Sequence, residues 1–397
     1  MNSFAGLGSQ YRDELFNNIL PFWLSNSNDE DHGGFFTCLD RSGKVYDTDK
    51  FLWLQSRQVW LFSYLFNHAG ENDQWLGFAF HGSAFLQKHG RDEDGSWFFS
   101  LDRTGRPLIG AHSIFTDLFA ALGFGSLYKA TEIDEFANIT ISTFSNALDR
   151  RSNPKGRYSK AVAGTRPLFS SSVPMIVLMV LNEIGWMLDR GKEKQLAEEC
   201  LDELLTNFYH SNSGLLLENV GYNGSFSNSF EGRLICGGTI CEGMWFIMDR
   251  AALNGDQRVI EKASETVLRA VEFAWDTDYG GLFYFQDLLG NPPQQLEWDQ
   301  KLWWVHAEAL IALLKAYDYT GRKEFWNWFL KVHDYTWSHF PDPKYGEWFG
   351  YLNRRGEVLL DLKGGKWKGC YHIPRMLYQC WRTFERLAAK VPLSTNS

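Results

Sequence analysis

The sequence lacks the marks of a secreted, membrane-bound or nucleic-acid-binding protein. It has no excess of positive charge, since its formal net charge is −9 at pH 7, and no basic stripe with interleaved aromatic residues. No apolar run is long enough to span a bilayer, and the first residues show no charged segment followed by an apolar one. We therefore predict a soluble, unexported chain with neither a membrane nor a nucleic acid as its partner.

Cysteine is sparse and shows no pattern. The six cysteines form neither a CxxC pair nor a ladder of short spacings, which argues against a disulfide framework and against a zinc site. We predict a reduced, cytoplasmic protein that holds no metal ion.

Aromatic residues, in contrast, are abundant. They make up 16% of the chain, and 17 of them are tryptophan, more than a helical core needs when Leu and Ala fill helix interfaces more easily. Aromatic faces pack on the apolar C–H faces of sugars, so some of these rings are expected to line a cavity for a carbohydrate or a nucleoside. Packing within the protein wall is the alternative interpretation.

A short motif that begins with glycine recurs along the whole chain. Its clearest copy, residues 33–44, places aromatic residues before an Asp-Arg-x-Gly turn, which is typical of a short hairpin. The copies lie 58 to 67 residues apart, which leaves room for one pair of helices in each unit. The other copies begin at Gly95, Gly156, Gly214, Gly281 and Gly346.

Helical periodicity between the copies predicts twelve helices. Six helical hairpins close into a ring without capping repeats, so we predict an all-α (α/α)6 toroid, with short β-hairpins in its loops, as one domain over residues 1–397. An open helical solenoid is the alternative. The expected helices are 9–24, 52–68, 74–89, 112–129, 133–149, 169–188, 192–209, 238–252, 258–275, 302–320, 322–339 and 370–388.

Polar residues gather near the start of the helix that follows each motif copy. In a ring of hairpins these helices face the axis, so their polar groups should meet in one cavity at the loop end. A glutamate within an apolar helix such as residues 302–310 is costly to bury alone, so we expect it to pair with an arginine across the cavity. For any one residue, a core ion pair or a helix cap is an equally good interpretation. The candidates include Trp53, Arg57, Gln58, His112, Glu242, His306, Glu308, His372 and Arg375.

Residues 153–167 form a separate basic segment that contains glycine. Such a segment can hold a phosphate, but the Walker A pattern G-x-x-x-x-G-K-[ST] is absent, so the signal is weak. The basic residues that we single out here are Arg157, Lys160 and Arg166.

Four segments together resemble the N-acylglucosamine 2-epimerase family, and the resemblance covers essentially the whole chain. It implies an (α/α)6 barrel, a homodimer, interconversion of N-acetylglucosamine and N-acetylmannosamine, and activation by ATP that is not consumed. Relatives that act on free mannose or cellobiose carry a histidine near the start of the third inner helix. Residues 171–175 contain none here, which favours the N-acyl sugar branch. The four segments are residues 50–60, 153–167, 304–309 and 363–375.

The resemblance also implies roles for particular residues. Inversion at C2 of an aldose requires ring opening, removal of the C2 proton and its return from the opposite face, by groups with a pKa near neutrality. His372 would be one such acid/base. The groups that would bind the sugar, stabilise the oxyanion or orient the bases are Arg57, Lys160, Glu308 and Arg375. The further candidates are Trp53, Gln58 and His112 for the sugar, and Lys160, Arg157 and Arg166 for ATP.

One position departs from the family pattern. The family places a second histidine in Pro-Gly-His, three residues before a glutamate; here Glu242 is present, but Thr239 stands at the histidine position. The pKa of a threonine hydroxyl is far too high for an unaided general base. Three interpretations are open: another group such as His306 or Glu242 serves that face, His372 serves both faces, or the protein is slow or inactive.

Two other functions are consistent with the same residues. Glycoside hydrolases also use (α/α)6 toroids and need two facing carboxylates, for which Glu242 and Glu308 are the candidates. A separation of about 5–9.5 Å in an open cleft would favour hydrolysis. The other possibility is a non-catalytic sugar- or nucleotide-binding protein that has lost a base at Thr239.

Overall fold

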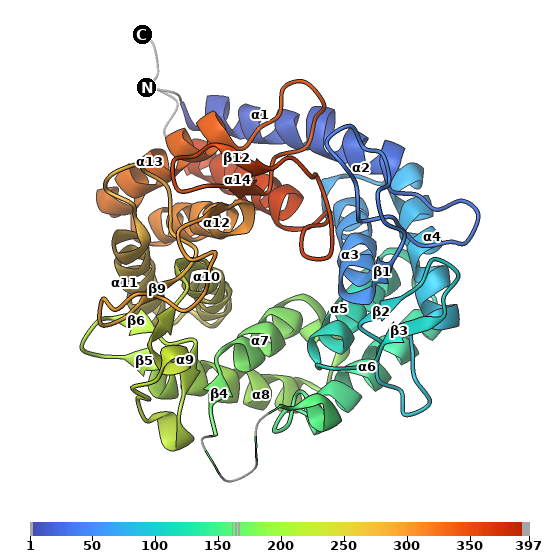
Figure 1. The fold of residues 1–397 in the computed structure, drawn as a ribbon, viewed down its shortest axis with the longest axis horizontal. Coiled ribbons are helices and arrows are strands. Elements are labelled where there is room, and N and C mark those ends of the chain that lie inside the picture. The colour runs from blue at the N-terminus through green and yellow to red at the C-terminus, as the bar shows by residue number, and fades with distance from the viewer. Residues whose placement is uncertain (1–2, 161, 163–164, 166, 391–397) are drawn as a thin grey trace.

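Two concentric sets of helices form a ring in the computed structural model, which describes residues 3–160, 162, 165 and 167–390 (Figure 1). The inner helices are α3 (Leu52–Ala69), α5 (Phe115–Thr131), α7 (Ser172–Ile184), α10 (Gly237–Asn254), α12 (Trp303–Thr320) and α14 (His372–Lys390). The outer helices are α1 (Phe4–Glu14) with α2 (Leu20–Asn26), α4 (Asp73–His89), α6 (Asp134–Asp149), α8 (Arg190–Asp202), α11 (Gln257–Ala274) and α13 (Lys323–His339).

The predicted (α/α)6 toroid is confirmed, and it is closed rather than an open solenoid. Helix α14 packs against α1, which joins the last unit of the chain to the first (Figure 1). The helix expected over residues 169–188 begins later, at Ser172, because residues 169 and 170 form a short strand. It ends at Ile184, where a 3-10 turn follows.

The difference between inner and outer helices follows from their sequences. Helix α7 is buried throughout residues 173–181, because it packs against neighbours on both sides and on its outer face. Helix α11 instead buries one stripe at helical spacing and exposes its charged face, as an amphipathic surface helix does. The apolar residues of that stripe include Ile260, Ala263, Val267, Ala270, Val271 and Ala274.

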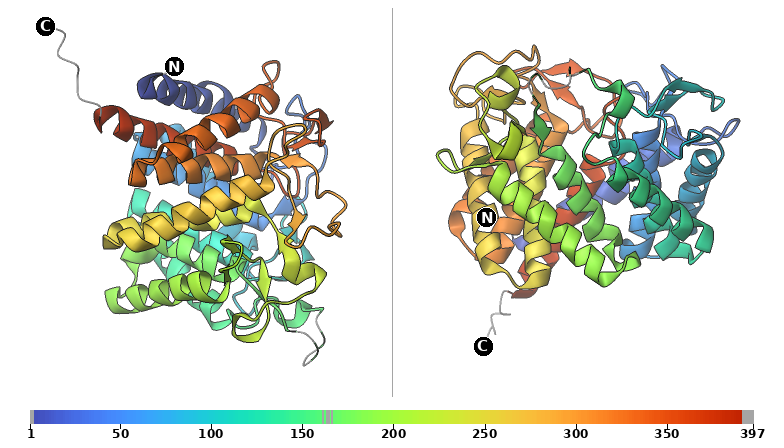
Figure 2. Two further views of the ribbon diagram at one scale, coloured as in Figure 1. Left: turned by 90° about the vertical axis from the view of Figure 1, so that its left-hand side faces the viewer. Right: turned by 90° about the horizontal axis from the view of Figure 1, so that it is seen from below.

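Short strands tie the loops together at one end of the ring (Figure 2). Two sheets have three antiparallel strands each: β1 (Lys50–Phe51), β2 (Ser100–Leu101) and β3 (Pro107–Ile109); and β10 (Lys301–Leu302), β11 (Tyr351–Leu352) and β12 (Val358–Leu360). The pairs are β4 (Phe169–Ser170) with β7 (Asn219–Val220), β5 (Tyr209–His210) with β6 (Leu215–Leu216), and β8 (Leu234–Ile235) with β9 (Gln286–Asp287). A one-turn helix, α9 (Phe230–Arg233), precedes β8.

The recurring motif forms the tight turn that its sequence predicts. In the first copy Asp40 Oδ1 accepts hydrogen bonds from the backbone N–H of Ser42 at 2.8 Å and of Lys44 at 2.9 Å. Gly43 has φ +89°, in the region that favours glycine. Asp102 and Asn353 make the equivalent bonds in two other copies.

Buried ion networks fasten these turns to neighbouring units. Arg103, in the second turn, bonds to Asp29 at 2.9 Å, and Asp29 also bonds to Lys50 at 2.9 Å. Burial alone would raise the pKa of Asp29, but hydrogen bonds from Arg103 and Lys50 lower it to about 2. The same arrangement recurs in Arg354, Asp276 and Lys301, and in Arg41, Asp342 and Lys363.

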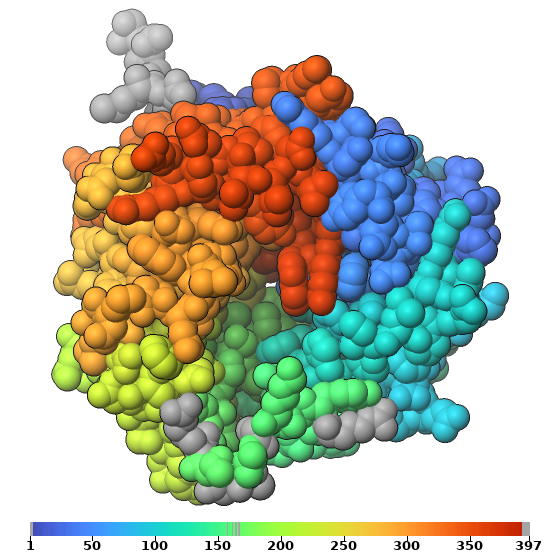
Figure 3. All heavy atoms as spheres, in the orientation of Figure 1, coloured from blue at the N-terminus to red at the C-terminus, as the bar shows by residue number. Residues whose placement is uncertain are grey.

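The loop end of the ring is hollowed at its centre. A space-filling view down the axis shows the depression between the inner helices and the loops around them (Figure 3). Within the described residues, no helix is both long and apolar enough to cross a membrane.

Candidate active site

The central cavity has two lobes that meet in the middle of the ring. The first has a volume of about 280 Å³ and the second about 470 Å³. Trp53, Arg57, Glu242 and Trp367 line both lobes, so these side chains stand where the lobes join. The cavity is therefore large enough for a monosaccharide, with a cation and an acid at its centre.

Aromatic rings form much of the cavity wall, as the excess of tryptophan predicts. Aromatic faces of this kind suit the C–H faces of a sugar ring or chain. The rings that line the second lobe are Trp53, Tyr284, Trp303, Trp304, Tyr351 and Trp367.

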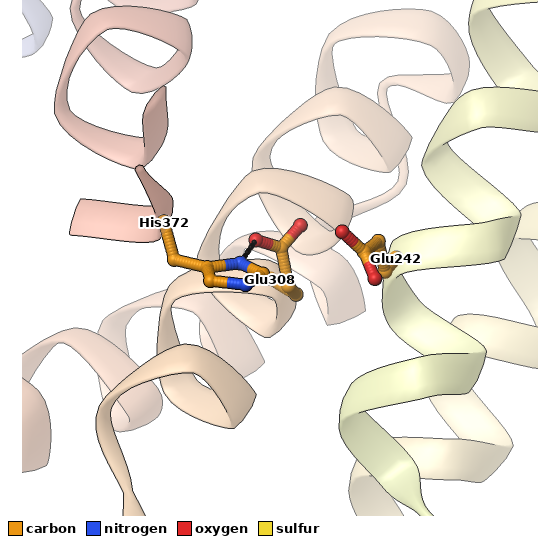
Figure 4. Close-up of side chains that lie close together, drawn as sticks. All are labelled: Glu242, Glu308 and His372. Carbon is orange, nitrogen blue, oxygen red and sulfur yellow. Dashed lines mark hydrogen bonds and ion pairs between the residues drawn. The ribbon is translucent and has the colours of Figure 1, made fainter. Parts of the chain in front are cut away.

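His372, in the first turn of α14, presents its second ring nitrogen to the second lobe. Its Nδ1 lies 2.8 Å from Glu308 Oε1 on α12 (Figure 4). An ionised carboxylate only accepts hydrogen bonds, so Nδ1 carries the proton and Nε2 is left with a lone pair. Burial, together with the charge of Arg375, lowers the pKa of His372 well below its usual value. The imidazole is therefore neutral and available as a base at pH 7.

Arg375, one turn further along α14, holds the two glutamates in place. Its Nη2 donates to Glu308 Oε1 at 2.7 Å and also to Glu242 Oε1 on α10. The second oxygen of Glu308 accepts a hydrogen bond from Trp245 Nε1 at 2.8 Å. Glu308 is 0% exposed, so it orients His372 and cannot itself touch a ligand.

Arg57, on α3, is a buried cation held by aromatic rings. Its guanidinium carbon lies 4.0 Å from the ring centroid of Phe119 and 4.3 Å from those of Trp53 and Tyr371. Burial lowers its pKa to about 10. Its Nε is buried and has no hydrogen-bond partner. Because Arg57 also lines both lobes, its guanidinium is well placed to receive a negatively charged ligand atom there.

Comparison with known proteins identifies the family. A model of the N-acylglucosamine 2-epimerase (GlcNAc 2-epimerase) domain matches residues 34–375. The chain belongs to the N-acylglucosamine 2-epimerase family. It is 36% identical over 394 residues to the N-acylglucosamine 2-epimerase of Bos taurus, covering 96% of this chain and 92% of that protein.

Other relatives agree with this assignment. The N-acylglucosamine 2-epimerase of Mus musculus is 35% identical over 379 residues, covering 93% of this chain and 90% of that protein. The solved structure of cellobiose 2-epimerase from Spirochaeta thermophila superposes with a TM-score of 0.82 at 22% identity, covering 97% of this chain and 98% of the other. That likeness shows that the two proteins share a fold. Sugar epimerases are isomerases, so the family places this chain in that class of enzyme.

Most residues that the family resemblance singled out meet in the cavity. Glu242, Glu308, His372 and Arg375 form the hydrogen-bonded network described above. Arg57 adjoins it through Tyr371, whose ring it contacts and whose hydroxyl bonds to Arg375. Two aromatic candidates also line the cavity: Trp53 borders both lobes, and His112 lies in the first lobe, stacked on Phe99 with 4.3 Å between ring centroids.

Two predicted site residues lie elsewhere and leave the candidate set. His306 is fully buried: its Nε2 accepts a hydrogen bond from the backbone N–H of Leu282 at 3.0 Å, and its Nδ1 lies 2.8 Å from Leu302 O. Burial lowers its pKa to about 3. Gln58 is also fully buried and donates to Ser27 Oγ at 2.7 Å. Both point away from the cavity because they lie on the outward faces of α12 and α3.

The predicted nucleotide residues fall at the edge of what the structure describes. Lys160 is exposed in the loop before β4 and does not line either lobe. Arg166 and the side chain of Arg157 lie outside the described residues.

Two residues of the site escaped the analysis of the sequence. Trp245 lies three residues after Glu242 on the same helical face, a spacing that could have identified it. Tyr371 precedes His372, and its hydroxyl accepts a hydrogen bond from Arg375 Nη1 at 2.7 Å.

The glutamates and the histidine also form the one group of possible metal ligands found among the described residues. One ligand atom from each of Glu242, Glu308 and His372 lies within 4.8 Å of the others. Arg375 already bonds to both carboxylates, and His372 Nδ1 faces Glu308. A guanidinium therefore occupies the position that a metal ion would need.

Proposed function

We propose that the protein interconverts N-acetylglucosamine and N-acetylmannosamine by proton transfer at C2 of the open-chain sugar. The observation that carries this proposal is the state of His372: neutral, held by Glu308, and with Nε2 facing an aromatic cavity. Membership of the N-acylglucosamine 2-epimerase family supports the choice of substrate.

The geometry suits abstraction of a proton next to an aldehyde. His372 Nε2 takes the proton from C2, and electrons move toward the C1 oxygen, which becomes an enolate. Arg57, a buried cation whose side chain lines both lobes, stabilises that oxygen, because a charge in a desolvated site interacts strongly. Glu308 keeps the tautomer of His372 and stabilises the imidazolium that forms.

Glycoside hydrolysis is not favoured by the two carboxylates. Glu242 and Glu308 bond to the same nitrogen of Arg375, and their nearest ligand atoms lie within 4.8 Å. A hydrolase needs one carboxylic acid that touches the glycosidic oxygen. Glu308, with both oxygens bonded and no exposed surface, cannot provide it.

ATP as an activator that is not consumed belongs to the same proposal. Lys155 and Lys160 are exposed, as phosphate ligands need to be. The backbone carbonyl of Pro154 accepts a hydrogen bond from Ile114 N–H at 3.0 Å, so this segment lies beside residues 112 and 113, which line the first lobe. Titrating ATP into the epimerisation assay, with 31P NMR to show that ATP is unchanged, tests this effect.

A homodimer and a cytoplasmic location complete the proposal. All six cysteines are free and buried, which suits a reducing compartment. Analytical ultracentrifugation tests the dimer, and cell fractionation tests the location.

The activity itself is tested by incubating the purified protein with N-acetylglucosamine and separating the products. We expect N-acetylmannosamine to accumulate, and we expect a His372→Asn variant of normal fold to form none. Absence of product from the unaltered protein, with and without ATP, would favour the interpretation as a sugar-binding protein.

A further inference from the structure

The first lobe of the cavity contains a histidine to which the proposed mechanism gives no role. His112 lies in the loop between β3 and α5 and lines this lobe, whereas His372 lies on α14 and lines the second. Helix α3 stands between α5 and α14 in the ring, and its Arg57 lines both lobes (Figure 1). When Arg57 holds the C1 oxygen, C2 therefore lies near the junction, with the lobe of His372 on one side and the lobe of His112 on the other.

The position of His112 is fixed by its neighbours. Its ring stacks on that of Phe99, with 4.3 Å between the ring centroids and 26° between the ring planes. Its backbone N–H donates to Gly110 O at 2.8 Å, and the backbone N–H of Phe99 donates to Ile109 O at 3.0 Å. The stack covers one face of the imidazole, whereas the nitrogens lie on the ring edge. Among the residues that the structure describes, no other residue forms a hydrogen bond with these nitrogens, so they are available to a ligand in the lobe.

The side chain of His112 can exchange protons with water, because it is only half-buried. Burial lowers the pKa of His112, and the charges of Lys155 and Lys366 lower it further. A lower pKa makes the protonated imidazole a stronger acid. Once it has taken a proton from water, His112 therefore gives that proton up readily to a carbon that carries negative charge.

The other polar groups of the first lobe do not suit proton transfer at C2. Glu242 bonds to Arg375, whose positive charge opposes protonation of that carboxylate. The pKa of Arg57 is about 10, so it keeps its proton. Of the described residues that line this lobe, only His112 has a side chain whose usual pKa lies near neutrality. The hydroxyl groups, whose pKa values are far higher, belong to Ser113, Thr116, Ser172 and Thr239.

We propose that His112 is the second acid/base of the reaction and serves the face of C2 opposite to His372. This inference rests on the proposed epimerase function and deepens it. It explains how a chain with threonine at residue 239 can invert a carbon centre.

The protons balance in the proposed step, which begins with His372 neutral and His112 protonated. On one face the C2–H bond breaks, the proton moves to His372 Nε2, and the electron pair moves toward the C1 oxygen beside Arg57. On the other face the electron pair returns to C2 and forms a new C2–H bond with the proton of His112. The enzyme ends with His372 protonated and His112 neutral. Exchange of protons with water restores both, and the reverse reaction uses the same groups with their roles exchanged.

The test follows two readouts in D2O: formation of the other epimer, and exchange of the C2 hydrogen without inversion. His112→Phe keeps a ring that can stack on Phe99 but has no nitrogen to carry a proton. We expect epimerisation to fall by about 100-fold or more in both directions. Exchange should stay within about tenfold of the unaltered protein for the epimer whose C2 hydrogen faces His372, and should be lost for the other epimer. A residue that only bound or positioned the sugar would lower both readouts for both epimers.

Two further variants check the assignment independently. In His372→Asn the pattern should be reversed, with exchange kept only for the epimer whose C2 hydrogen faces His112. In His112→Ala the smaller side chain leaves room in the first lobe for a free imidazole. Added imidazole should therefore raise the epimerisation rate of His112→Ala by about tenfold or more, because it replaces the missing acid/base.

The matched control is His32→Asn. His32 is exposed in a loop and lines neither lobe, so this variant should leave both readouts unchanged. Glu265→Gln, on the outer helix α11, is a second control with the same expected result. Circular dichroism of each variant verifies that it is folded.

Different failures have different meanings. If a folded His112→Phe variant epimerises within about threefold of the unaltered protein, or loses epimerisation and the exchange of both epimers equally, the role of His112 is wrong while the proposed function stands. Failure of imidazole to raise the rate of His112→Ala would also count against that role. If the unaltered protein shows neither exchange nor epimer with any N-acyl hexosamine, the proposed function fails and the role of His112 fails with it.

Discussion

His372 can remove a proton only while its Nε2 carries none. Its hydrogen bond to Glu308 determines which ring nitrogen carries the proton. Glu308 accepts the Nδ1 proton at 2.8 Å and is itself fixed by Arg375 and Trp245. The depressed pKa of His372 keeps the ring neutral as the pH falls through 6.5, the usual value of a histidine. Proton abstraction by His372 should therefore show no loss of rate between pH 7 and 6.

The first prediction concerns the tautomer. In Glu308→Gln the amide can donate to Nδ1, which moves the ring proton to Nε2 and removes the base. We expect kcat to fall by about 10³-fold or more, as amide replacement of an orienting carboxylate does elsewhere, with little change in KM. Steady-state kinetics measure this, with Glu265→Gln as the control. A change in KM with kcat unchanged would show that Glu308 binds sugar instead.

The second prediction separates the two histidines of the inner helices. His306→Leu leaves the buried N–H of Leu282 without an acceptor, which should lower the free energy of unfolding by about 1–3 kcal/mol. Because His306 lies outside the cavity, kcat should stay unchanged. Urea denaturation and kinetics on the same preparation measure both quantities. Loss of activity with an unchanged free energy of unfolding would show instead that His306 belongs to the active site.

Residue patterns predicted the charged part of the site but not its support. Arg57, Glu308, His372 and Arg375 were visible because charged groups in apolar helices need partners. His306 and Gln58 carried the same signal, because a sequence shows that a polar residue lies in an inner helix but not which way it points. Tyr371, whose hydroxyl accepts a hydrogen bond from Arg375, is uncharged and carried no such signal.

At the scale of the element, the recurring turn has two structural roles. Its Asp or Asn side chain closes the turn, and its arginine reaches a buried aspartate in a neighbouring unit, as Arg103 does to Asp29. The sequence motif predicted the turn, because the bonds are local. The arginine contacts join residues 74 or more positions apart, so no local pattern revealed them.

The third prediction is an acid transition in stability that belongs to these networks. The pKa of Asp29 is about 2 in the folded protein and 3.8 in a model peptide, so its ionisation stabilises the fold above about pH 4. That contribution, of about 2 kcal/mol, is lost as the pH falls toward 2. The free energy of unfolding in urea should therefore fall steeply below pH 4.

Variants assign this transition to the network. Asp29→Asn leaves Lys50 buried without its charge partner, and we expect it to cost about 3–5 kcal/mol at pH 7 and less at pH 3. Asp13→Asn removes an exposed pair with Arg12 and should cost about 0–1 kcal/mol at either pH. An Asp29→Asn penalty that is the same at both pH values would contradict the account.

At the scale of the whole molecule, the ring shares one apolar core. Residues from the inner and the outer helices belong to a single buried cluster, and α14 closes the ring against α1. The number of units could be predicted from the spacing of the motif, because six hairpins suffice to close a ring. The shape of the cavity could not, since it depends on how loops from several units fold over the axis.

The fourth prediction is that this shared core unfolds in one step. Far-ultraviolet circular dichroism, which follows the helices, and tryptophan fluorescence, which follows packing, should give superimposable urea curves. Removing residues 1–26, and with them the helices that complete the ring beside α14, should abolish that cooperative transition. Two separate transitions in the intact chain would show instead that parts of the ring fold independently.

The central claim is that a proton leaves C2 and another returns from the opposite face. Proton NMR of N-acetylglucosamine incubated with the protein in D2O tests this most directly. We predict that N-acetylmannosamine forms and that it carries deuterium at C2. N-acetylmannosamine that forms with its C2 hydrogen fully retained would contradict the account, because inversion would then occur without proton exchange with the groups on either face.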